Sequence, residues 1–119
     1  MHPITNRIGC VFVPVSDMQR SIDFYSRLFH QQIDRTTHEG RIYTVPMEGE
    51  VCLILDGHKP VENSSQPLFF VWSPDIQAAR AFLIDMGAVN VGEIMDIGSL
   101  FTVSFQDPDG NRLMVSQPK

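Results

Sequence analysis

The sequence has few of the features that define several large classes of protein. Among its 119 residues there are only two cysteines, Cys10 and Cys52, too few for the disulfide framework of a small secreted domain. Its longest apolar runs, such as 68–72, are far too short to cross a membrane, and the N-terminus lacks the apolar core of a signal peptide. We therefore expect a cytoplasmic protein that has no contact with a membrane.

Basic residues are also scarce. Lys and Arg total 9 against 14 Asp and Glu, which gives a formal net charge of −5. Proteins that bind nucleic acid need clustered positive charge to displace counterions from phosphates, so no nucleic-acid partner is expected. The length and the 43% of hydrophobic residues are typical of one globular domain with a core of its own.

The sequence does contain an internal repeat. After an insertion at 107–109 in the second half, Gly49 corresponds to Gly110 and Leu53 to Met114. A repeat of this length spans a whole supersecondary unit, so we expect two copies of one small module that share a core. The clearest matches are 17–19 with 75–77, Phe24 with Phe82, Gly40 with Gly98, and 42–45 with 100–103.

Each half predicts the same order of elements, a strand, a helix and three further strands. Ser16 and Gln19 have the spacing of a capping box at the start of the first helix. In the second helix, Phe82 belongs to the apolar stripe that we expect to be buried, and Gly87 is well placed to end the helix. The expected strands are 8–15, 32–37, 41–47 and 51–55 in module one (7–56), and 67–72, 89–95, 99–106 and 112–116 in module two (67–117), with a linker at 57–66.

Two segments carry a resemblance to a known family. Val-Ser-Asp-Met-Gln-Arg-Ser-Ile-Asp-Phe-Tyr at 15–25 and Phe-Gln-Asp-Pro-Asp-Gly-Asn-Arg-Leu at 105–113 resemble the vicinal oxygen chelate superfamily. This superfamily contains glyoxalase I, extradiol dioxygenases, and fosfomycin and bleomycin resistance proteins. The resemblance implies a single α+β domain in which two βαβββ modules form a curled, eight-stranded mixed sheet with the helices outside. A ligand would bind in the concave side, the cup, and the protein would be a homodimer.

The resemblance also implies where a metal would bind, at four equivalent strand positions. In this sequence they are occupied by Cys10, Leu53, Leu68 and Met114. A hard or borderline divalent ion needs imidazole, carboxylate or thiolate donors, which two leucines and a thioether do not supply. The four histidines have no metal-binding spacing with one another. We therefore expect neither a metal nor another cofactor.

The predicted ligand-binding residues follow from the alternation of side chains along a strand, which places neighbours two residues apart on one face. The same alternation predicts that Leu55 faces the cup while Cys52 and Ile54 face the helices. Cys10 and Cys52 would then lie on opposite faces of the sheet and form no disulfide. The predicted site consists of Cys10, Phe12, Leu53, Leu68, Phe70, Trp72, Arg112 and Met114.

The sequence assigns no catalytic residue. Asp107 and Asp109 flank a proline in a turn, where carboxylates cap backbone N–H groups, and Tyr25 follows Phe24 in a helix that buries one face. The favoured interpretation is a protein without the family's metal ligands that binds a small organic molecule in an apolar cup. The first alternative is a metal-dependent lyase or dioxygenase with a displaced metal site. The second is a structural or interaction module whose cup is filled by its own side chains.

Overall fold

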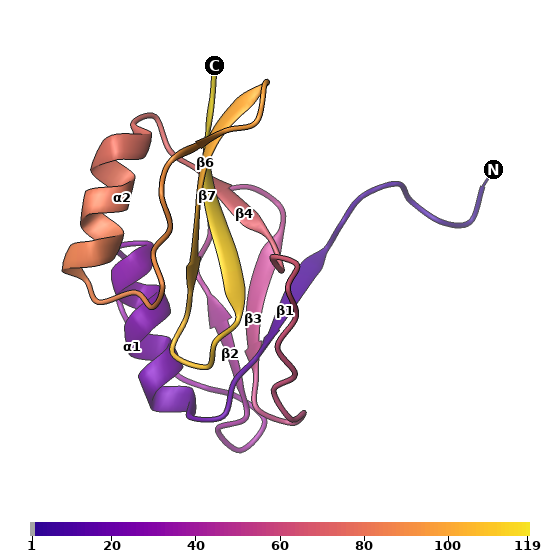
Figure 1. Ribbon diagram of the computed structural model, residues 1–119. Helices are drawn as coiled ribbons and strands as arrows, with labels where there is room; N and C mark the ends of the chain where they lie inside the picture. Colours follow the sequence, from indigo (N-terminus) through magenta and orange to yellow (C-terminus); the bar gives the residue numbers. More distant parts are fainter. Residues whose placement is uncertain (1) are drawn as a thin grey trace.

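The computed structural model describes residues 2–119 and shows an α+β fold (Figure 1). No helix in this part of the chain is long and apolar enough to span a membrane. The elements are β1 (Cys10–Pro14), α1 (Met18–Leu28), β2 (Ile42–Val45), β3 (Cys52–Asp56), β4 (Phe70–Trp72), α2 (Ile76–Asp85), β5 (Met95–Asp96), β6 (Leu100–Gln106) and β7 (Arg112–Pro118).

The strands form two mixed sheets, with the orders β1-β3-β2 and β4-β7-β6-β5. The repeat is visible in their topology, because the first strand of each half pairs in parallel with the last strand of the same half. Segment 32–37 does not form the predicted strand, and only an isolated bridge joins Thr37 to Ile42. The segment has a single large apolar side chain, Ile33, and this side chain is 54% exposed, so nothing anchors the segment to the core.

An aspartate caps the N-terminus of each helix. The side chains of Asp17 and Asp75 accept the N–H groups of Arg20 and Ala78, each at 3.1 Å. The first helix therefore begins one residue later than the Ser16 capping box predicts. As expected, Gly87 follows the end of α2, and its φ of +86° is a conformation that glycine adopts without strain.

Each sheet buries one face against its helix. Figure 1 shows α1 and α2 on the same side of the molecule, with α1 beside the first sheet and α2 beside the second. The core under α1 contains Val13, Tyr43 and Leu55, and the core under α2 contains Leu83 and Leu113, all at most 1% exposed. The arrangement leaves the opposite faces of both sheets without a helix to cover them.

A turn between β6 and β7, residues 107–111, joins the two halves. Asp107 is fully buried and accepts the hydroxyl of Tyr25 at 2.6 Å and the backbone N–H groups of Asp109 and Asn111, each at 2.9 Å. The Asn111 amide donates to the backbone carbonyl of Pro14 at 2.9 Å. The turn carboxylate therefore has the expected structural role, and it also holds a side chain of the other half.

The second carboxylate of this turn lies at the start of α1. The Asp109 carboxylate accepts hydrogen bonds from the backbone N–H of Ser16 at 3.2 Å and from the Ser16 hydroxyl. It also accepts the Ser21 hydroxyl at 3.3 Å and the Arg20 guanidinium at 3.1 Å. A negative charge at the N-terminus of a helix is favourable because the helix dipole is positive there. Ser16, which the sequence assigns to a capping box, therefore bonds to the second half instead.

Candidate ligand-binding pocket

The pairing of β1 with β3 determines which side chains share a face of the first sheet. The two strands are parallel, with Cys10 opposite Cys52 and Phe12 opposite Ile54, and residues directly opposite each other point to the same side. Cys52 and Ile54 therefore lie on the face that carries Cys10 and Phe12. Leu53 lies on the face that packs against α1, where it is 4% exposed.

The predictions that Leu53 and Leu55 face the cup and that Cys10 and Cys52 lie on opposite faces are therefore wrong. The error is one residue in the alignment of the halves, since Phe70 lies opposite Met114 as Phe12 lies opposite Ile54. Ile54 is thus the counterpart of Met114, and a shift of one residue along a strand moves a side chain to the other face. Both cysteines are free thiols, as predicted, although they lie on the same face of the sheet and not on opposite faces.

The second sheet carries an exposed aromatic pair. The rings of Phe70 and Trp72 lie 4.9 Å apart at 84°, an edge-to-face contact, although Phe70 is 44% and Trp72 62% exposed. Leu68 is also exposed, and its N–H donates to the carbonyl of Arg112 at 2.8 Å. The predicted residues of the second half are therefore neighbours on β4 and β7.

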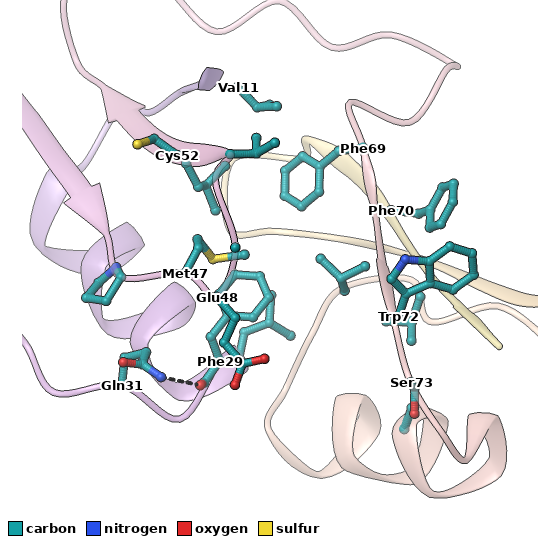
Figure 2. A pocket seen from close by; sticks show the side chains of 18 of the residues that line it. Val11, Phe29, Gln31, Met47, Glu48, Cys52, Phe69, Phe70, Trp72 and Ser73 are labelled. Atoms are coloured by element: carbon teal, nitrogen blue, oxygen red, sulfur yellow. Dashed lines mark hydrogen bonds between the residues drawn. The ribbon is translucent and has the colours of Figure 1, made fainter. Parts of the chain in front are cut away.

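A cavity of about 780 Å³ lies between the two halves (Figure 2). Its polar groups, among them Gln31, Glu48, Glu50 and Ser73, are few beside the aromatic and aliphatic side chains. In Figure 2 Phe29 and Met47 lie on one side of the cavity, and Phe70 and Trp72 lie on the other. The apolar lining comes from Val11, Leu28, Phe29, Pro46, Met47, Val51, Cys52 and Leu53 of the first half and from Phe69, Phe70, Val71, Trp72, Ala79, Phe82, Leu83 and Val115 of the second.

Three of the eight predicted residues, Leu53, Phe70 and Trp72, line this cavity. The other five, Cys10, Phe12, Leu68, Arg112 and Met114, are not among its lining residues.

Sequence reasoning did not assign Phe29, Met47 or Phe82 to the site. Helical spacing predicts Phe82 in the buried stripe of α2, yet it is 46% exposed and borders the cavity. The apolar stripe of α2 was a signal in the sequence. A stripe too wide to be covered by one sheet indicates that part of it borders a cavity or another surface.

The family follows from the sequence match. Residues 7–115 match the Glyoxalase/Bleomycin resistance protein/Dioxygenase superfamily. The chain belongs to this superfamily. No curated protein gives a match to the sequence.

Solved structures share this superfamily fold at low sequence identity. TnmS3, an antibiotic binding protein from Streptomyces sp. CB03234, is 24% identical with a TM-score of 0.79, over 99% of this chain and 100% of that one. A glyoxalase-related enzyme from Clostridium phytofermentans is 14% identical with a TM-score of 0.73, over 100% of both chains. The oxidase ChaP-H1 is 18% identical with a TM-score of 0.71, over 97% of this chain and 98% of that one. The fold therefore occurs both in a binding protein and in enzymes, and it does not choose between them.

The metal that many enzymes of this superfamily hold does not fit the side chains found here. With the corrected register the four strand positions contain Cys10, Ile54, Leu68 and Met114, and two aliphatic side chains donate nothing. Within residues 2–119, no group of three or more His, Cys, Asp and Glu side chains is placed to hold a metal ion. The donor set therefore gives no basis for a metal-dependent step.

One histidine contact was not visible in the sequence. The rings of His38 and His58 lie 6.5 Å apart, and the ring and N–H of His58 contact Asp56 at 2.9 and 2.8 Å. These bonds hold the pKa of Asp56 below its ordinary value, the backbone N–H having the largest effect. The cluster lies at the end of β3 and does not border the cavity.

Proposed function

We propose that this protein binds a small, mainly apolar organic molecule between its two halves and does so without a metal. The observation that carries the proposal is the cavity of about 780 Å³, which lies within the usual size range of small-molecule sites and has an apolar, aromatic lining. A cavity of this size also argues against a module filled by its own side chains. The antibiotic-binding activity of TnmS3, which has the same fold, is consistent with this choice.

The side chains around the cavity favour a planar ligand with a cationic group. Trp72 and Phe70 present aromatic surface that an aromatic ring can stack on, and Met47 offers a flexible thioether that adapts to irregular shapes. The charged groups on the lining are the carboxylates of Glu48 and Glu50. Glu50 is paired with the Arg7 guanidinium at 2.5 Å, so Glu48 is the carboxylate proposed to attract a cation. An anionic ligand is disfavoured for the same reason.

We further propose that a second copy of the chain covers the exposed aromatic face. Phe12, Leu68, Phe70 and Trp72 are between 40% and 62% exposed, an unusual amount of apolar surface for the face of a monomer. The radius of gyration is 15.0 Å, whereas a compact chain of this length has about 13.5 Å. In the dimer, the three-stranded sheet of one copy would meet the four-stranded sheet of the other and complete a cup of seven strands instead of the eight that the sequence predicts.

The ligand is found and the pocket tested by the fluorescence of Trp72, the only tryptophan in the chain. A panel of neutral, cationic and anionic aromatic compounds is titrated, and any compound that quenches the fluorescence is confirmed by calorimetry. Trp72→Ala should then weaken binding by at least about 30-fold, the effect of removing a central aromatic anchor. Ile97→Ala, at a site that is 56% exposed and away from the cavity, should leave affinity unchanged. Equal affinity of Trp72→Ala and the parent protein would refute the assigned site.

The dimer is tested separately by sedimentation equilibrium. Phe12→Glu places a charge on the face proposed to be covered and should give a monomer. Ile97→Glu, at a position of similar exposure (56% against 59%), should leave the dimer intact. A parent protein that sediments as a monomer would refute this part of the proposal and leave the pocket between the halves untouched.

A further inference from the structure

The corrected register places two thiols side by side. Cys10 and Cys52 are directly opposite each other on the parallel strands β1 and β3, and the N–H of Cys52 donates to the carbonyl of Gly9 at 2.9 Å. Cys52 is exposed and Cys10 is partly exposed in the single chain, so an ion can reach both thiols in the monomer. Cys52 is one of the residues that line the cavity, and Figure 2 shows its sulfur pointing away from Phe69 and Met47. The thiol pair therefore lies at the edge of the proposed ligand pocket.

The spacing of the strands decides what this pair can do. Neighbouring strands lie about 4.8 Å apart, and side chains directly opposite each other in a parallel pair project in the same direction. A disulfide needs Cα atoms about 4.4–6.8 Å apart, which this spacing allows, yet both cysteines are free thiols in this structure. Metal–thiolate bonds of about 2.3 Å each place an ion between sulfurs about 4.6 Å apart, so the same spacing also accommodates a bridging ion.

The number of donors decides which ion fits. Among residues 2–119 no third Cys, His, Asp or Glu side chain is placed to complete a site with these two. Zinc takes four protein ligands in structural sites, whereas thiolates select Cu(I) among the metals of the cell. A soft ion that is satisfied by two sulfurs therefore suits the pair.

We propose that Cys10 and Cys52 together bind one soft, monovalent ion of the Cu(I) class as a two-thiolate site on the face of the first sheet that carries Phe12. Two S–H bonds break, two metal–sulfur bonds form, and two protons are released to solvent. The oxidation state of the metal and of the sulfurs does not change.

The test uses Cu(I) itself with reduced, full-length protein under anaerobic conditions. The protein competes for the ion with a chromophoric Cu(I) chelator, and the loss of colour gives stoichiometry and affinity. We expect one equivalent to be bound by the parent protein and by Met95→Leu, which removes an exposed thioether on β5 and keeps both thiols. Cys10→Ser and Cys52→Ser should each lose more than about 100-fold in affinity, because removing a ligand costs more than removing one of its hydrogen-bonding partners.

Three results would overturn the proposal. The first is that the parent protein fails to withdraw Cu(I) from the chelator. The second is that a single serine variant, shown by circular dichroism to be folded, binds Cu(I) as tightly as the parent. The third is that the protein as purified has lost both titratable thiols together with two hydrogens of mass, because this identifies the pair as a disulfide.

Discussion

The hydrogen bond between Tyr25 and Asp107 gives the sharpest test of how the two halves are held together. Tyr25→Phe removes one oxygen and keeps the ring, which packs against Phe24 and Phe29 with centroids 5.1 and 6.4 Å away. The hydroxyl is buried and donates to the Asp107 carboxylate at 2.6 Å. A hydrogen bond to a charged group contributes about 1.5–3 kcal/mol net. We expect the free energy of unfolding to fall by about 2 kcal/mol and the melting temperature by roughly 8 °C.

The same bond gives a dependence on pH whose sign can be worked out. Burial, and then the negative charge of Asp107, raise the pKa of Tyr25 far above its ordinary value of 10.0. The folded protein therefore keeps the hydroxyl protonated while the unfolded chain ionises. The stability that this group contributes is fully present below pH 10 and is lost above it, at about 1.4 kcal/mol per pH unit. The difference in free energy of unfolding between the parent and Tyr25→Phe should therefore decrease by about 1.4 kcal/mol from pH 9 to pH 11.

Urea denaturation followed by far-ultraviolet circular dichroism at pH 7, 9 and 11 measures both effects. Tyr43→Phe is the matched control, since its hydroxyl is bonded to the neutral backbone N–H of Asp34 at 3.1 Å. Loss of a neutral bond costs about 1 kcal/mol. The reasoning fails if Tyr25→Phe costs no more than Tyr43→Phe, or if the gap between parent and Tyr25→Phe stays constant up to pH 11.

Three further substitutions are tested by the same denaturation experiment. Asp75→Ala removes the N-cap of α2 and should cost about 1 kcal/mol, so an unchanged midpoint would contradict the cap. Gly110→Ala should cost more than Gly49→Ala, because both have φ above +80° but only at Gly110 does the added Cβ meet another group, the Asn63 amide nitrogen at 2.7 Å. Equal losses would show that Asn63 moves aside without cost. Leu55→Ala empties a fully buried position and should cost about 2–5 kcal/mol, whereas less than 1 kcal/mol would place Leu55 outside the core.

Local patterns in the sequence predicted most of the elements. The first helix, the glycine that follows α2 and the turn at 107–110 all depend on residues close together in the chain, and all are found, although the cap of the first helix is Asp17 instead of the predicted Ser16. The strand at 32–37 was predicted from the turn-like residues 38–40 that follow it and not from an alternating pattern. With Ile33 as its only large apolar side chain, it had no face to bury.

The candidate site was harder to predict, because it depends on register and on contacts between the halves. An insertion near 107–109 makes the two halves unequal in length, and taking its net length as three residues instead of two aligned Leu53, rather than Ile54, with Met114. Because of that shift, Cys10 and Cys52 were predicted on opposite faces of the sheet, and the core residue Leu53 was predicted to face the cup. The cavity lining also contains Phe29, at the end of a helix, and no pattern within one element reveals which surface of the other half it meets.

The joining turn also sets the order in which the protein can mature on the ribosome. Tyr25 donates to a residue 82 positions later, and the N–H of Ser16 donates to a residue 93 positions later. Until Asp107 and Asp109 have left the exit tunnel, the N-terminus of α1 lacks the Asp109 carboxylate and the Tyr25 hydroxyl lacks its acceptor, Asp107. Contacts of such long sequence separation form late and slow the folding of a chain. During synthesis the first half therefore lacks these stabilising contacts until nearly all of the second half has been made.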